Sequence, residues 1–143
     1  MDVVRVARVD CTEARLRSLI EDLPAGRVLA LSSQVLLGNG TIGHLPMLDF
    51  HCHESLENDI LVRNVLHELG LNGYVAKSGK SYHFYANSLV DETTLLYTLG
   101  RSLLFSPIVD RAWIAHQIIE RACGLRISPG KDYGRCPEIS FQV

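Results

Sequence analysis

The sequence lacks an excess of charge of either sign. Its 143 residues include 14 Lys and Arg against 16 Asp and Glu, and the formal net charge is -2. The surface as a whole therefore gives no sign of a nucleic-acid binder, and any site for an anion must be local.

Cysteine is scarce, and its four positions are widely spread: Cys11, Cys52, Cys123 and Cys136. No C-x-x-C pair of the zinc-binding kind is present, nor the dense cysteine framework of small secreted proteins, so we expect reduced thiols. The first residues lack the apolar core of a signal peptide, and no apolar run approaches the roughly 20 residues of a membrane helix. These absences predict a cytoplasmic protein that does not contact a membrane.

What is present is a mixture of helical and extended patterns without repeats or linkers, which predicts one α+β domain over residues 1–143. Apolar residues at three- and four-residue spacing predict helices at 12–23, 55–69, 92–103 and 111–123, with Thr12 and Asp91 as caps and Gly70 as a stop. Runs rich in β-forming residues predict strands at 3–9, 27–37, 45–52, 73–77, 81–86, 125–128 and 138–143. We expect a mostly antiparallel sheet backed by about four helices.

The stretch Ser78-Gly79-Lys80-Ser81 is similar to the end of a phosphate-binding loop. Such a loop needs G-x-x-x-x-G-K-[ST] between a strand and a helix, but the position five before Gly79 is Tyr74. An alternating aromatic run follows, which is typical of a strand. The phosphate-loop interpretation is therefore rejected, and the segment is predicted to be a turn between two strands.

Two of the predicted strands carry polar residues with a period of two. Side chains alternate between the faces of a strand, so Asp49 and His51 share one face of their strand, and Ser81, His83 and Tyr85 share one face of theirs. If the apolar positions between them cover the helices, then Asp49, His51, Ser81 and His83 meet on the open face of the sheet. An acid, two imidazoles and a hydroxyl on rigid strands predict a site for a metal and a phosphate.

Simpler interpretations remain open at each position. One face of an antiparallel sheet can be polar because it is solvated, and Tyr85 can be a packing residue. Asp110 precedes a predicted helix and can be its N-cap. His51 and His53 lie on one side of an extended chain and form a weak candidate for zinc.

Three short motifs, taken in order, resemble those of the archaeo-eukaryotic primase superfamily. They are Leu48-Asp49-Phe50-His51, then Ser81-Tyr82-His83, then Val109-Asp110, and the basic stretch 125–131 resembles the strand and loop that follow the third motif. The likeness spans about residues 45–131. It implies a primase-like or RRM-like core.

The resemblance also implies a nucleotidyltransferase site that acts in DNA replication or repair. By position, Asp49 and Asp110 would be catalytic metal ligands, Ser81 and His83 would contact the phosphates of a nucleoside triphosphate, and Lys80 and Arg126 would add positive charge. Mg²⁺ or Mn²⁺ is the expected cofactor, and a nucleic-acid template is the expected partner. An oligomer is compatible with this pattern.

The chain departs from the family pattern at one position. The first motif of the family usually carries two acids, and here His51 stands at the second, so His51 would join the metal site unless Glu54 reaches back to it. An imidazole favours Mn²⁺ or zinc over Mg²⁺. Three functions therefore remain open: a metal-dependent nucleotidyltransferase, a noncatalytic module that binds a nucleotide or nucleic acid, and a structural partner subunit.

Overall fold

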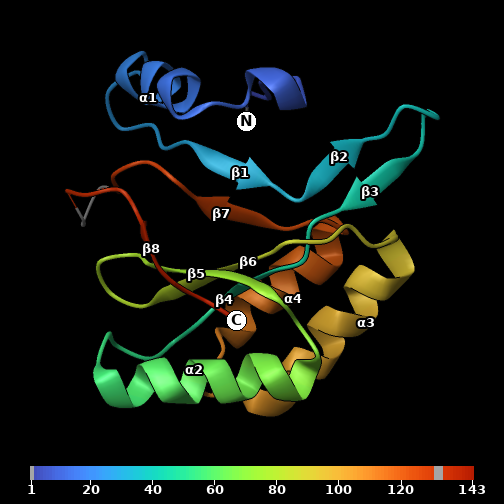
Figure 1. Cartoon of the computed structure of the whole chain (residues 1–143), viewed down its shortest axis with the longest axis vertical. Helices are drawn as coiled ribbons and strands as arrows, with labels where there is room; N and C mark the ends of the chain where they lie inside the picture. The colour runs from blue at the N-terminus through green and yellow to red at the C-terminus, as the bar shows by residue number, and fades with distance from the viewer. Residues whose placement is uncertain (1, 131–133) are drawn as a thin grey trace.

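A four-stranded antiparallel sheet forms the centre of the molecule (Figure 1). The computed structural model describes residues 2–130 and 134–143. The strands stand in the order β4-β6-β5-β8, and their bounds are Met47–Asp49 for β4, Tyr82–Ala86 for β6, Gly73–Lys77 for β5 and Glu138–Gln142 for β8. This arrangement confirms the predicted α+β class with an antiparallel sheet.

Three helices lie on one side of this sheet, one of them below it and two to its right in Figure 1. They are α2 (Leu56–Leu69), α3 (Glu92–Ser102) and α4 (Arg111–Glu120), and a short 3-10 turn, Leu103–Phe105, follows α3. The core fills the space between the two layers. It includes Leu48, Phe50, Phe84, Leu66, Leu95 and Ile114, all at most 2% exposed.

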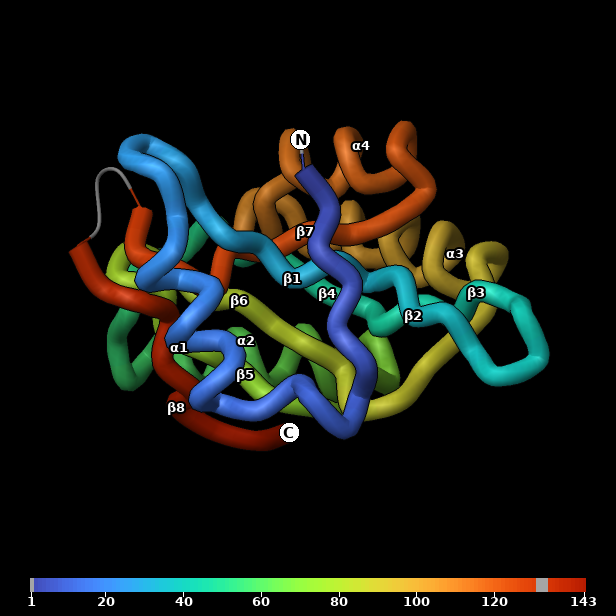
Figure 2. Tube along the Cα trace, turned by 90° about the horizontal axis from the view of Figure 1, so that it is seen from above, coloured from blue at the N-terminus to red at the C-terminus, as the bar shows by residue number. Residues whose placement is uncertain are grey.

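The other side of the sheet carries two small strand pairs and one helix. Strand β1 (Ala30–Ser32) pairs with β7 (Gly124–Arg126), and β2 (Gln34–Leu36) pairs with β3 (Ile42–His44) through the turn at Gly38-Asn39-Gly40. Helix α1 (Glu13–Glu21) passes above β5 and β8 in Figure 2 and has no fully buried residue. The molecule therefore covers its central sheet on both sides.

Local sequence signals explain the helix boundaries. Side chains of Thr12, Ser55, Asp91 and Asp110 each accept a hydrogen bond from the main-chain N–H three residues later, at 2.7 to 3.2 Å, and so cap the four helices. Helix α2 ends at Gly70, whose φ of 69° is the left-handed conformation that glycine adopts readily. The predictions of a helix after Thr12, Ser55, Asp91 and Asp110 are confirmed.

Several predicted boundaries are wrong. Residues 3–9 form no strand; they contain the 3-10 turn Arg8–Asp10, and Val3 and Val9 are exposed. The strand predicted over 27–37 is divided between β1 and β2 at Ser33, whose buried hydroxyl accepts a hydrogen bond from the Cys123 amide at 2.8 Å. The last helix ends at Glu120 instead of 123, because Arg121 takes a left-handed conformation.

No helix in the part of the chain that the structure describes has the length and apolar character needed to cross a membrane.

Candidate functional site

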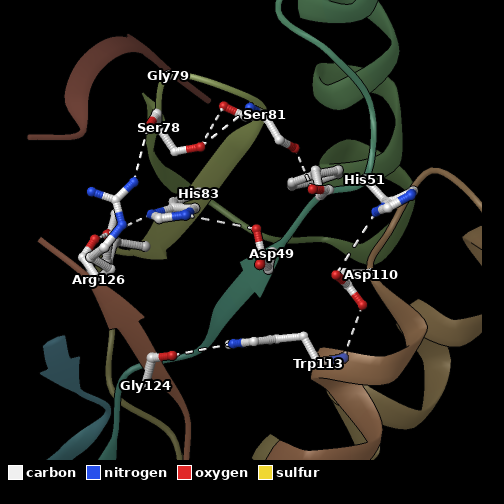
Figure 3. A network of polar contacts seen from close by, with 12 residues as sticks. Asp49, His51, Ser78, Gly79, Ser81, His83, Asp110, Trp113, Gly124 and Arg126 are labelled. Atoms are coloured by element: carbon white, nitrogen blue, oxygen red, sulfur yellow. Dashed lines mark hydrogen bonds and ion pairs between the residues drawn. The ribbon is translucent and has the colours of Figure 1, made fainter. Parts of the chain in front are cut away.

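The first predicted contact is between β4 and β6. Asp49 and His83 stand directly opposite each other in the antiparallel register, and Asp49 Oδ1 lies 3.8 Å from His83 Nε2 (Figure 3). The alternation of strand side chains therefore places the first acid and the histidine of the second motif on one face, as predicted.

Main-chain hydrogen bonds join the third motif, Val109-Asp110, to the end of β4. The Asp110 amide donates a hydrogen bond to the Asp49 carbonyl at 2.9 Å, and Phe50 and Val109 form an antiparallel bridge beside it. One carboxylate oxygen of Asp110 caps α4 by accepting from the Trp113 amide at 2.9 Å. The other lies 3.9 Å from His51 Nδ1, so Asp110 both caps its helix and faces the site.

The two acids influence each other. Burial, followed by the nearby negative charge of Asp110, raises the pKa of Asp49 from 3.8 to about 7. The positive charges of Arg126 and Lys80 lower the pKa of Asp49 only in part. A pair of acids held together in this way is stabilised when a cation lies between them.

His83 does not supply that positive charge. Its side chain is 8% exposed, and burial, with the charge of Arg126 as the second cause, lowers the pKa of His83 to about 4. The ring is therefore neutral at physiological pH, and its approach to Asp49 is not an ion pair despite the short distance. The Tyr85 hydroxyl lies 3.3 Å from Nδ1, on the other side of the ring.

The expectation that this face is open to solvent is wrong. Met47, Ser81 and His83 are all at most 8% exposed, because β7 lies over this face of β4. The Tyr85 hydroxyl donates to the Arg126 carbonyl at 3.4 Å, and the Trp113 indole N–H donates to the Gly124 carbonyl at 3.2 Å. The site is therefore a partly enclosed recess, with Asp49 at 24% side-chain exposure.

Ser81 and Lys80 occupy the turn beside this recess. The Ser81 hydroxyl donates a short hydrogen bond to the Phe50 carbonyl and so ties the start of β6 to the end of β4. Lys80 is exposed, at the position after Gly79, whose φ of 99° shapes the turn. Ser81, the expected phosphate contact, is buried, whereas Lys80, expected to add positive charge, is exposed.

The Arg126 guanidinium donates its hydrogen bonds to main-chain carbonyls. Its guanidinium donates to the carbonyl of Ser78 at 3.0 Å, to that of Arg135 at 3.3 Å and to that of Ser128. These bonds join β7, the β5–β6 turn and the segment before β8, and Figure 3 shows the bond to Ser78. Lys131, at the end of the basic stretch, lies outside the described residues.

Two residues that the sequence analysis named have contacts that it did not predict. Tyr85, expected on the polar face of its strand as a packing residue, places its hydroxyl against His83. Glu54 does not reach back to the acids; its carboxylate accepts from the Gly79 amide at 2.7 Å and pairs with Arg135 at 3.3 Å. Nothing in the local sequence indicates that long-range contact.

A metal at this site would depend on its substrate for ligands. The described residues contain no group of three or more His, Cys, Asp or Glu side chains placed to hold an ion. Asp49 and Asp110 nevertheless fit Mg²⁺ or Mn²⁺, since Mg²⁺ is commonly held by one or two carboxylates together with substrate phosphates. A surface hollow beside Pro46, Ala86 and Arg101 lies at the opposite end of β6 from this site.

Comparison with known proteins agrees with this arrangement. No curated protein and no solved structure matches the chain significantly. The model of the family described as "Archaeo-eukaryotic primase 1D-like" matches residues 8–137, a stretch that includes β4, β6 and the start of α4 with their polar side chains. The chain therefore belongs to the archaeo-eukaryotic primase-like family.

Proposed function

We propose that the protein binds a nucleoside triphosphate together with a divalent metal at Asp49 and Asp110 and transfers the nucleotidyl group. The observation that carries the proposal is the acid pair: a main-chain hydrogen bond joins the two positions, and the nearby Asp110 carboxylate helps to raise the pKa of Asp49 to about 7. Two carboxylates that repel each other in a recess form a binding site for a cation.

Each residue has a stated part in this proposal. Asp49 and Asp110 would hold Mg²⁺ or Mn²⁺, which when bound neutralises the triphosphate and aligns it with an attacking 3′-hydroxyl. Lys80, exposed on the turn beside Ser81, is placed to bind the phosphates as they enter. Ser81 holds the ends of β4 and β6 together through the Phe50 carbonyl, and His83 borders the metal-binding recess. The nucleic-acid template would lie across the mouth of this recess.

A noncatalytic nucleotide-binding module is the second candidate, and one observation favours it. The position of the family's usual second acid holds His51, whose ring lies 3.9 Å from Asp110 and is 65% exposed. With only two acids, the site has one carboxylate fewer than the family pattern for catalysis. Such a protein would bind the metal-nucleotide complex without transfer.

Measurements of triphosphate binding and of primer extension, each with Mg²⁺ and with Mn²⁺, distinguish the two candidates. We expect the wild type to bind triphosphate better with Mn²⁺, because the site lacks one oxygen ligand. His51→Asp should raise Mg²⁺-dependent binding and raise or create primer extension. His67→Asp, at an exposed position on α2, is the matched control and should change neither.

The outcomes separate the candidates cleanly. Extension by the wild type supports the enzyme, and binding without extension by either form supports the module. A wild type that binds no triphosphate with either metal, together with a folded and equally inert His51→Asp protein, contradicts both.

A further inference from the structure

The buried ring of His83 has two different surroundings, one at each nitrogen. The Tyr85 hydroxyl oxygen lies 3.3 Å from Nδ1, and Asp49 Oδ1 lies 3.8 Å from Nε2. The Tyr85 hydroxyl itself donates to the main-chain carbonyl of Arg126 at 3.4 Å.

These contacts determine where the ring carries its proton. A carbonyl oxygen can only accept a hydrogen bond, so the Tyr85 hydroxyl is the donor in its contact with the Arg126 carbonyl. The Tyr85 hydroxyl directs its hydrogen to the carbonyl and is left to accept through its oxygen. The hydroxyl oxygen therefore accepts from Nδ1, and the neutral ring carries its proton on that nitrogen.

The opposite nitrogen, Nε2, then presents a lone pair to Asp49. The described residues give Nε2 no hydrogen bond, and its neighbour there is Asp49 Oδ1 at 3.8 Å, which is beyond hydrogen-bond range. An imidazole lone pair and a carboxylate oxygen are both electron-pair donors. Two such donors that face each other across a short gap call for an electron-pair acceptor between them.

We propose that His83 Nε2 and Asp49 are joint ligands of a transition-metal ion, and that Tyr85 is the positioning residue that keeps Nε2 free to bind it. Metal–nitrogen and metal–oxygen bonds of about 2.0–2.2 Å on each side can span the gap with one ion. A ligating histidine usually donates its other N–H to a hydrogen-bond acceptor, and the Tyr85 hydroxyl has that part at Nδ1.

This inference deepens the proposed function, because it concerns the same recess, and it changes the role of His83 from donor to a phosphate to ligand of the metal. Two protein ligands, with Asp110 near, leave the remaining coordination positions to water and phosphate oxygens. The imidazole gives the site a preference for Zn²⁺, Co²⁺ or Mn²⁺ over Mg²⁺. The metal specificity predicted from His51 is thus assigned to the buried histidine beside Asp49.

Nitrogen NMR of the ¹⁵N-histidine-labelled protein tests the inference without any measurement of activity. The resonance pair that disappears in His83→Gln belongs to His83, and the exposed His67 serves as an internal reference. We expect the proton on Nδ1 in the metal-free protein. Zn²⁺ alone, which is diamagnetic, should move Nε2 to the position of a metal-bound nitrogen, and Mg²⁺ alone should leave it unchanged.

Tyr85→Phe is the positioning variant, since it removes the hydroxyl and keeps the ring. We expect part of the proton population to move to Nε2 and Zn²⁺ affinity to fall about 10-fold, the lower end of the usual effect of such a partner, because Nδ1 loses the hydroxyl that accepts its hydrogen bond. A purely structural role for Tyr85 would leave the position of the proton unchanged.

The proposal is overturned if the proton resides on Nε2 in the wild type, or if saturating Zn²⁺ leaves the His83 nitrogens unmoved. Either result leaves the proposed function intact where metal-dependent triphosphate binding is still observed. A metal-bound Nε2 in a protein that binds no triphosphate overturns the proposed function and leaves this inference intact.

Discussion

Replacing Asp49 by asparagine should stabilise the folded protein, and the gain should depend on pH. Asparagine keeps the size of the side chain and cannot ionise. In the wild type, the pKa of Asp49 is about 7 in the folded state, against 3.8 as its ordinary value. Between these values the folded protein binds a proton that the unfolded chain has released, so its stability falls as the pH rises through this range and stays low above it.

The difference between the two pKa values sets the size of the effect. At about 1.4 kcal/mol per pH unit, ionisation of Asp49 destabilises the folded state by about 4 kcal/mol once the pH is well above 7. The side chain is 24% exposed, so water screens part of this penalty, and we expect about 2–4 kcal/mol. Burial of His83 has the opposite pH dependence between about pH 4 and 6.5, but it acts equally on both proteins.

Urea unfolding at pH 5 and pH 8.5 measures the difference. We expect Asp49→Asn to unfold at a clearly higher urea concentration than the wild type at pH 8.5, and by a margin of about a third of that at pH 5, because pH 5 already lies above the ordinary pKa of 3.8. Asp10→Asn, at an exposed position, is the control and should change stability little at either pH. Mn²⁺ added at pH 8.5 should stabilise the wild type only. An equal gain at both pH values, or a loss at pH 8.5, would refute the reasoning.

Three further predictions concern the frame around the site. Gly73→Ala should lower the free energy of unfolding and the melting temperature, because the new Cβ would lie 2.1 Å from the Tyr85 carbonyl oxygen; Gly100→Ala, in open space on α3, should be neutral or stabilising by up to about 1 kcal/mol. Tyr82→Phe should destabilise by about 1–2 kcal/mol in urea unfolding, because the hydroxyl accepts from the Ser55 amide at 2.9 Å; an unchanged midpoint would contradict this. Glu54→Ala should speed hydrogen exchange at the Gly79 amide, which loses its acceptor, and equal protection in both proteins would show that the contact is dispensable.

The sequence was informative wherever the determining signal was local. Alternation along a strand was enough to place Asp49 and His83 on one face, and the capping role of Asp110 follows from its position before a helix. The same local reasoning failed at residues 3–9, which have β-forming side chains but no pairing with any described strand. A high β-propensity does not by itself provide a neighbouring strand with which the segment can pair.

The environment of the site depended on contacts between distant parts of the chain. Strand β7 has only three residues and pairs with β1 across the register Ala30 to Arg126, and no periodicity indicates that it would lie over β4. That placement buries His83, directs Arg126 to main-chain carbonyls and changes an expected open face into a recess. The polar residues were identifiable from sequence, but their burial, and therefore their pKa values, required the tertiary fold.

The hydrogen bond from the Asp110 amide to the Asp49 carbonyl has a consequence for how this architecture can evolve. Because the bond belongs to the main chain, the distance between the two positions does not depend on which side chains occupy them. A lineage can lose an acid and later regain it by single substitutions while the scaffold stays as it was. On the proposed function, a polymerising enzyme and an inert binding module built on this frame would differ by a few point mutations, in either direction.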